Sequence, residues 1–135
     1  MARRQSRRQD FRRALRNLSQ YRDSPTEFDV LTLTGFVGLY ETCFEQAWKA
    51  MKEALERDGY FEVKVGSPRM VLKQAYAARM IQDEHGWLEA LQARNEASHT
   101  YNEEVAYQIV NDTRRVYLPL FESLETELDA NWSEE

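Results

Sequence analysis

The chain has 135 residues, which favours a single domain built around one hydrophobic core. Apolar residues make up 42% of it and charged residues 30%, which excludes a disordered chain, and no apolar run approaches the roughly 20 residues that span a bilayer. The net charge of −5 argues against a general nucleic-acid binder, because binding through phosphate neutralisation needs clustered cations.

Arginine is concentrated at the start of the chain. Residues 1–22 contain eight arginines and one acidic residue, whereas residues 23–135 contain ten lysines and arginines against 22 aspartates and glutamates. Such asymmetry is typical of a basic arm that reaches for nucleic acid or for an acidic partner. It is equally typical of a solvated helix end whose arginines neutralise an acidic body. Both interpretations stay open, and we treat residues 1–10 as a basic N-terminal extension.

Cysteine usage and the N-terminal pattern indicate the compartment. The single cysteine, Cys43, excludes an internal disulfide framework and fits a reducing environment. The N-terminal arginines are not followed by the apolar stretch of a secretory signal. We therefore expect a cytoplasmic protein that is not inserted in a membrane.

Two amphipathic helices are expected in the first half of the chain. Phe11, Leu15 and Leu18 share one helical face, and this helix should end near the break at residues 23–26. A long helix follows and ends at Asp58-Gly59, because glycine can adopt the left-handed conformation that closes a helix. Its apolar positions advance by three and four residues and comprise Phe36, Leu39, Tyr40, Cys43, Phe44, Ala47, Trp48, Met51 and Leu55.

Three further helices are expected in the second half. Residues 61–65 alternate apolar and polar but are too few to build a sheet on, so we interpret them as an extended connection. Ser67-Pro68 opens a short helix and Asp83 opens the next. The last helix begins near Asn102 and should kink at Pro119, which lacks a backbone N–H. The apolar stripes comprise Val71, Leu72, Ala75 and Tyr76, then Trp87, Leu88 and Leu91, then Val105, Ile109, Val116, Leu120, Phe121, Leu124 and Leu128.

These elements predict the fold class. With five glycines and three prolines the chain has little turn chemistry, so long regular elements are expected. The sequence predicts an all-α protein, an antiparallel four-helix up-and-down bundle with one additional short helix. The bundle should form a single domain over residues 11–130.

The core-facing stripe of the fourth helix turns polar in its last two turns. At about 100° per residue, the buried face continues to Arg94, Asn95 and Ser98, with His99 at its edge. Burying such groups without partners would cost several kcal/mol. These side chains must therefore be paired, open to a cleft, or both.

Three interpretations of this polar cluster stay open. It could be a structural hydrogen-bond network that ties helix ends together. A metal site is the weakest of the three, because His85 and His99 are the only histidines and sit in different contexts. A phosphate-handling site is the third, since arginine binds phosphate with two N–H groups and histidine exchanges protons near neutral pH. RNA cleavage without a metal needs little more, because the 2′-hydroxyl of the substrate can be the nucleophile.

The same stretch resembles a known family. Residues 94–101 read Arg-Asn-Glu-Ala-Ser-His-Thr-Tyr, similar to the Arg-x-x-x-x-His-x-Tyr motif of the HepT branch of the HEPN (higher eukaryotes and prokaryotes nucleotide-binding) superfamily. The form Arg-Asn-x-x-Ser-His-x-Tyr is that of its nucleotidyltransferase substrate-binding proteins. Three other segments resemble that family in order and spacing: Phe44-Glu45-Gln46-Ala47-Trp48-Lys49, Ser67-Pro68-Arg69 and Tyr117-Leu118-Pro119. The resemblance covers roughly residues 11–128, and the ordered set is more specific than any one motif.

The resemblance implies a HEPN-like, HepT-like bundle that forms a homodimer beside a separate minimal nucleotidyltransferase, in a two-component system of the toxin–antitoxin type. In the toxin branch the motif arginine and histidine form a metal-independent endoribonuclease (RNase), and two motifs face each other across the dimer. The transferase neutralises the toxin by AMPylation, the addition of AMP to the motif tyrosine. Carried over, Arg94 would bind the scissile phosphate of an RNA substrate, His99 would act as general acid and base, and Tyr101 would accept AMP.

Other residues near Arg94 and His99 are expected to support the site. Asn95 would orient the site, and Ser98 lies on the same helical face. Glu41, Glu45 and Lys49 follow one another at four-residue spacing, typical of a solvated salt-bridged face, although Glu45 could instead pair with Arg94 across the bundle. No metal or cofactor is implied. The alternative is a non-catalytic subunit that binds substrate for the nucleotidyltransferase.

Overall fold

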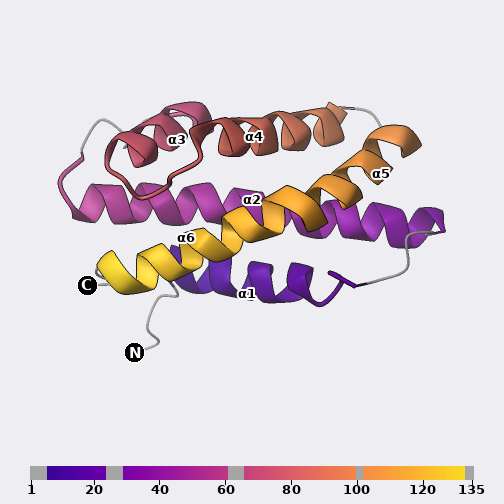
Figure 1. Ribbon diagram of the computed structural model, residues 1–135, viewed down its shortest axis with the longest axis horizontal. Coiled ribbons are helices and arrows are strands. Elements are labelled where there is room, and N and C mark those ends of the chain that lie inside the picture. The colour runs from indigo at the N-terminus through magenta and orange to yellow at the C-terminus, as the bar shows by residue number, and fades with distance from the viewer. Residues whose placement is uncertain (1–5, 24–28, 61–65, 100–101, 133–135) are drawn as a thin grey trace.

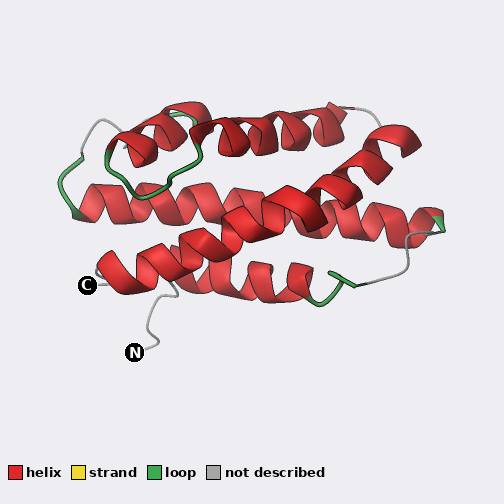
Figure 2. Ribbon diagram, in the orientation of Figure 1, coloured by secondary structure: helices red, strands yellow, loops and turns green. Residues whose placement is uncertain are grey.

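The computed structural model describes residues 6–23, 29–60, 66–99 and 102–132, and within these ranges it contains helices and no strand (Figure 2). None of the helices in these ranges combines the length and apolarity that a bilayer span requires. The all-α prediction is confirmed. The helices are α1 (Arg7–Ser19), α2 (Val30–Arg57), α3 (Pro68–Ala77), α4 (Glu84–His99), α5 (Glu103–Asp112), the π-helical turn η2 (Thr113–Tyr117) and α6 (Leu118–Asn131).

Helix α2 is the longest element, and the other helices pack around it. Figure 1 shows α1 along one side of α2, with α3 and α4 along the opposite side. Helices α5, η2 and α6 form one continuous ribbon that crosses α2 obliquely (Figure 1). Chain direction reverses from α1 to α2, from α2 to α4, and from α4 to the α5–α6 ribbon. The fold is therefore the predicted up-and-down bundle of four main helices, and α3 is the additional short one.

Phe121 on α6 is the centre of the hydrophobic core. Its ring lies 6.5 Å from that of Phe11 on α1, 6.1 Å from that of Tyr40 on α2 and 5.5 Å from that of Trp87 on α4. All four side chains are at most 2% exposed. Such aromatic pairs contribute about 0.5–1.5 kcal/mol each beyond their area burial. The Phe121 ring of α6 thus contacts an aromatic ring on each of the other three main helices.

Polar residues cap the helix starts. The Ser6 hydroxyl accepts the backbone N–H of Gln9, and the Gln9 side chain accepts the N–H of Ser6 in return, which is a complete capping box. Such caps contribute about 1 kcal/mol each. The side chains that accept the corresponding N–H groups at α2, α3, α4 and α5 belong to Asp29, Ser67, Asp83 and Asn102. The predicted starts at Ser67, Asp83 and Asn102 are therefore confirmed.

Two helices end at a residue in the left-handed conformation, which is a glycine in one helix and an arginine in the other. After α2, Gly59 has φ of 94° and Tyr60 donates its N–H to the Leu55 carbonyl. After α3, Arg79 has φ of 65° and Met80 donates its N–H to the Ala75 carbonyl. Both are Schellman caps. Glycine adopts this conformation freely, whereas an arginine is strained in it.

The last helix passes Pro119 without breaking. Leu118 donates its N–H to the Thr113 carbonyl, five residues back, so a wide π turn precedes the proline. Proline lacks the N–H for a regular α-helical bond and crowds the preceding turn. A kink was predicted at Pro119, and the irregularity that the structure shows is the π turn at Thr113–Tyr117, before the proline.

Tyr76 does not belong to the buried face of α3. The apolar stripe predicted for the third helix includes Tyr76, but this residue is 47% exposed, because α3 is short and buries only the face of Val71, Leu72 and Ala75. That part of the prediction is wrong. The extended connection predicted at 61–65 lies outside the described residues.

Candidate functional site

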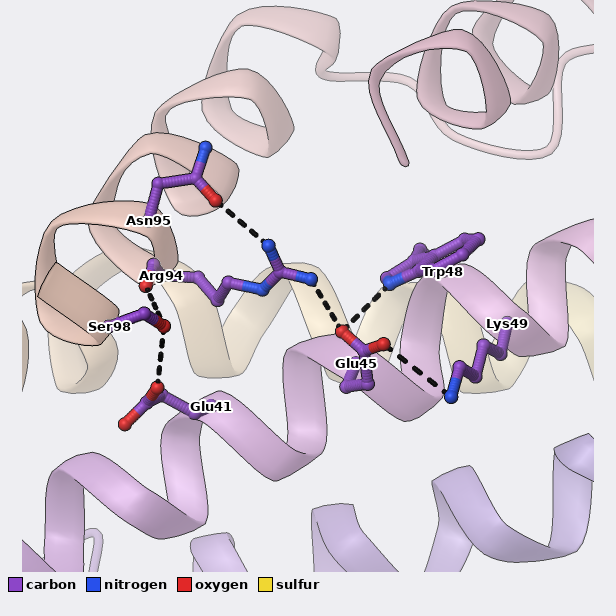
Figure 3. Close-up of polar contacts among 7 residues, drawn as sticks. All are labelled: Glu41, Glu45, Trp48, Lys49, Arg94, Asn95 and Ser98. Atoms are coloured by element: carbon purple, nitrogen blue, oxygen red, sulfur yellow. Dashed lines mark hydrogen bonds and ion pairs between the residues drawn. The ribbon is translucent and has the colours of Figure 1, made fainter. Parts of the chain in front are cut away.

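Helix α4 carries the polar cluster because its two halves differ. The first half is anchored in the core by Trp87, Ala90 and Leu91, which are at most 8% exposed. From Arg94 onward this face is polar: Arg94 and Ser98 meet carboxylates of α2, and Asn95 accepts from Arg94 (Figure 3). These polar groups are therefore not buried without partners: some are paired and others lie in solvent.

Arg94 extends from α4 to the neighbouring helix α2. Its Nη2 donates to Oε2 of Glu45 at 2.7 Å and its Nη1 donates to Oδ1 of Asn95 at 2.8 Å (Figure 3). The guanidinium carbon lies 6.0 Å from the centre of the Phe44 ring, within cation–π range. The side chain keeps 25% of its exposure. The contact of Glu45 with Arg94, which the sequence left open as an alternative to a solvated salt-bridged face, is present. It fixes the guanidinium while part of the group remains open to solvent.

Glu45 collects donors from three side chains. Besides Arg94, the indole Nε1 of Trp48 donates to the same Oε2 at 3.0 Å, and Nζ of Lys49 lies 3.5 Å from Oε1 (Figure 3). Burial by itself would raise the pKa of Glu45, but the hydrogen bonds from Arg94 and Trp48 and the charges of Arg94 and Lys49 outweigh it and lower that pKa. Glu45 is therefore ionised at neutral pH and offsets the charge of Arg94.

A second polar contact lies one helical turn away. The Ser98 hydroxyl is 3.0 Å from Oε2 of Glu41 and 3.0 Å from the Arg94 carbonyl, and its single hydrogen serves one of them at a time (Figure 3). Glu41 and Glu45 are four residues apart on α2, as Arg94 and Ser98 are on α4. The two helices are therefore joined by a short polar ladder.

His99 lies outside this ladder. It is the last residue of α4, it is exposed, and no hydrogen bond or ion pair links it to another described residue. Asn95, four residues earlier, is also exposed. The other histidine, His85, pairs with Glu89 at 2.6 Å on the first turn of α4. Tyr101, the predicted modification site, lies outside the described residues. The structure thus brings Arg94, Asn95, Ser98 and Glu45 together and leaves His99 in solvent beside them.

The other side of α4 is acidic. A groove of about 350 Å³ between α4 and the α5–η2 segment is lined by Glu89, Glu96 and Asp112. Tyr117 borders this groove, and burial together with the charges of Asp112, Glu89 and Glu96 raises the pKa of Tyr117 to about 12. The carboxylates of this groove would repel an anion. Within the described ranges, no three His, Cys, Asp or Glu side chains are placed to hold a metal ion.

Several N-terminal arginines contact the body of the protein. Arg12 forms an ion pair with Asp129, and Arg22 with Glu122, both on α6. Arg8 is 7% exposed. These contacts agree with the interpretation that the basic start neutralises an acidic body.

The sequence interpretation missed the role of one side chain. Periodicity places Trp48 on the apolar stripe of α2, and it does lie partly buried against the core. Its indole N–H nevertheless faces Glu45. The three-residue spacing between Glu45 and Trp48 on a helix was the signal that would have found this contact.

Comparison with known proteins settles the family. A family model described as "Nucleotidyltransferase substrate binding protein like" matches residues 6–130. The chain belongs to this family. Membership confirms the resemblance found in the sequence. It indicates that the protein is a helical partner subunit of a nucleotidyltransferase.

A solved structure supports the fold of this nucleotidyltransferase substrate-binding-like protein. A crystal structure of a protein from Thermus thermophilus is 24% identical in sequence, with a TM-score of 0.74 over 87% of this chain and 98% of that one. At this identity the likeness shows the fold alone. No curated protein matches the chain.

Proposed function

We propose that the protein is the HEPN-type subunit of a two-component system with a separate minimal nucleotidyltransferase, and that as a homodimer it cleaves RNA without a metal ion. The observation that carries this proposal is the state of Arg94. Two of its five N–H groups are held by Glu45 and Asn95, while its side chain keeps 25% exposure, and His99 is exposed at the end of the same helix. A fixed and accessible guanidinium suits the binding of a phosphodiester.

The proposed reaction is an internal transfer. The 2′-hydroxyl oxygen of the RNA attacks the adjacent phosphorus, and the bond from phosphorus to the 5′-oxygen of the next nucleotide breaks. A base removes the proton of the 2′-hydroxyl and an acid protonates the leaving 5′-oxygen, which gives a 2′,3′-cyclic phosphate and a free 5′-hydroxyl. Arg94 stabilises the negative charge on the phosphate, and His99 exchanges the protons.

A homodimer would supply what one chain lacks. One imidazole cannot serve as base and acid in the same step, so two copies of His99 would share these roles. In a single chain Glu45 also offsets the charge of Arg94. A second Arg94 would restore a positive potential for the phosphate.

Neutralisation is proposed to occur at Tyr101. Its phenol oxygen would attack the α-phosphorus of ATP, bound by the partner transferase, and pyrophosphate would leave. Mass spectrometry after incubation with the partner and ATP should locate one AMP on Tyr101. Tyr101→Phe should prevent the addition, whereas Tyr76→Phe, which alters an exposed tyrosine on α3, should not. Full modification of the Tyr101→Phe variant would contradict this part.

The nuclease assay has a matched control. Purified, unmodified protein should cut RNA in the presence of EDTA, and His99→Ala should abolish cutting while the helical circular dichroism spectrum is unchanged. His85→Ala replaces the other histidine, which is exposed at the opposite end of α4, and should cut normally. Uncut RNA with folded wild-type dimer would rule out the nuclease.

One observation favours the alternative, a non-catalytic subunit that binds substrate for the transferase. Arg94 is paired with a carboxylate, and no hydrogen bond joins it to His99 within the described residues. This alternative is supported if the protein forms a stable complex with the transferase and a third molecule, rather than Tyr101, receives the nucleotide.

A further inference from the structure

The side chains of α2 that face Arg94 come from one short segment. Phe44, Glu45 and Trp48 occupy neighbouring positions on one side of the helix. Phe44 lies under the guanidinium, Glu45 binds it, and Trp48 binds Glu45. The segment therefore contacts Arg94 directly and also fixes the group that contacts it.

Glu45 has a competing partner. Lys49 lies one turn further along α2, and its ammonium approaches the other carboxylate oxygen at 3.5 Å. The side chain of Glu45 is 31% exposed, so without another restraint its carboxylate could rotate toward Lys49 and solvent. The indole N–H of Trp48 opposes that rotation because it donates to Oε2, the oxygen that also accepts from Arg94.

The indole itself is well anchored. Trp48 is partly buried against the hydrophobic core, and an indole has only two side-chain torsions. An anchored donor that binds a flexible carboxylate lowers the number of conformations of both Glu45 and Arg94. Arginine recognises phosphate with two parallel N–H groups, so the orientation of its plane matters for binding.

We infer that Trp48 is a positioning residue, whose indole N–H holds Glu45 against Arg94 and so sets the plane of the guanidinium toward phosphate. This inference rests on the proposed role of Arg94 in binding an RNA phosphodiester. Trp48 touches no reacting atom and acts only through Glu45 and Arg94. Its effect must therefore disappear when Arg94 is absent.

The test removes the N–H and keeps an aromatic ring. Trp48→Phe should lower kcat/KM for RNA cleavage about tenfold, the effect expected for one hydrogen bond to a charged group. Trp132→Phe is the matched control, since the Trp132 indole donates to Glu127 at 3.1 Å on α6. That variant should cut at the wild-type rate. In an Arg94→Ala background, Trp48→Phe should cause no further loss of cleavage or of binding to RNA.

Two further measurements separate the inference from the nuclease proposal. A 2′-deoxy oligonucleotide has no 2′-hydroxyl nucleophile and reports phosphodiester binding alone, by fluorescence anisotropy. Nitrogen-15 NMR of the Arg94 guanidinium reports whether its rotation is restricted. If wild-type protein fails to cut RNA, the nuclease proposal fails, and the inference is still supported by weaker oligonucleotide binding and a freer guanidinium in Trp48→Phe. Binding and Arg94 signals identical to those of Trp132→Phe would overturn it.

Discussion

Asp83 and Gly86 form the start of α4 together. Oδ1 of Asp83 accepts the backbone N–H of Gly86 at 2.9 Å, and a Cβ atom added to Gly86 would lie 2.5 Å from Oδ2 of the same carboxylate. The same Cβ would lie 3.2 Å from Cδ1 of Leu120 on α6. Glycine at this position therefore allows the helix to be capped and to pack closely at once.

Gly86→Ala should destabilise the protein. The added methyl group displaces the Asp83 cap and pushes on Leu120, and these costs exceed the helix propensity gained, for a net loss of about 1 kcal/mol. Gly35→Ala is the matched variant, because nothing lies within 4 Å of the corresponding Cβ on α2. It should stabilise by about 1 kcal/mol. Urea unfolding at one protein concentration measures both, and equal effects would refute the steric argument.

Substitutions at the two left-handed residues that end α2 and α3 should change stability in opposite directions. Arg79→Gly relieves an arginine held at φ of 65° and should raise the free energy of unfolding by about 1 kcal/mol. Gly59→Ala introduces the corresponding strain at φ of 94° and should lower it by about 1 kcal/mol. Thermal unfolding of the two variants is sufficient. A lower melting temperature for Arg79→Gly would mean that the arginine side chain contributes more than its backbone costs.

The Glu45–Arg94 contact predicts a pH dependence of stability. Because the pKa of Glu45 is lowered in the folded chain, its ionised form stabilises the fold. The contribution is complete above the unfolded-state pKa, about 4.3 for a glutamate, and is lost as the pH falls through the lower folded-state pKa. Glu45→Gln should therefore cost about 1 kcal/mol at pH 7 and nothing at strongly acidic pH. Glu96→Gln, which alters an exposed carboxylate on α4, should show no such convergence.

The core prediction concerns Phe121. Its ring contacts aromatic rings of α1, α2 and α4, so Phe121→Ala should cost about 3–5 kcal/mol and unfold the protein at a much lower temperature. Leu31→Ala alters a leucine that is 83% exposed and should change stability by less than about 0.5 kcal/mol. If the two variants melted together, Phe121 would not be the centre of the core.

Helix identities and starts were predictable because they depend on local chemistry. A serine, aspartate or asparagine before an apolar periodic run marks a cap whatever the rest of the chain does. It was harder to predict which residues of the last helix face the core. A regular period places Val116 and Leu120 on its apolar stripe, but both are only partly buried, whereas their neighbours Tyr117 and Phe121 are buried. The π turn at 113–117 shifts the face by one residue. Pro119 indicates an irregularity near this position, but it does not indicate that one extra residue is accommodated.

The candidate site was predictable to a similar extent. The polar end of α4 followed from periodicity. The Glu45–Arg94 contact could be named only as an alternative to a solvated face, because both residues lie beside apolar stripes that must meet but four-residue charge spacing also fits exposed salt bridges. The Trp48 contact was missed because a tryptophan on an apolar stripe is well explained by burial alone. The relation of His99 to Arg94 could not be derived, because the last residue of a helix has few neighbours to fix its side chain.

The π turn also bears on how this helix tolerates change in length. A wide turn accommodates one residue more than an α-helical turn, so the flanking segments keep the alignment they would have without that residue. Arg115 lies in η2, and its side chain is 74% exposed. Omitting it should convert η2 to ordinary α-helix while Phe121 still faces the core. The same omission within α2 would rotate half of that helix by about 100° and turn its apolar side to solvent.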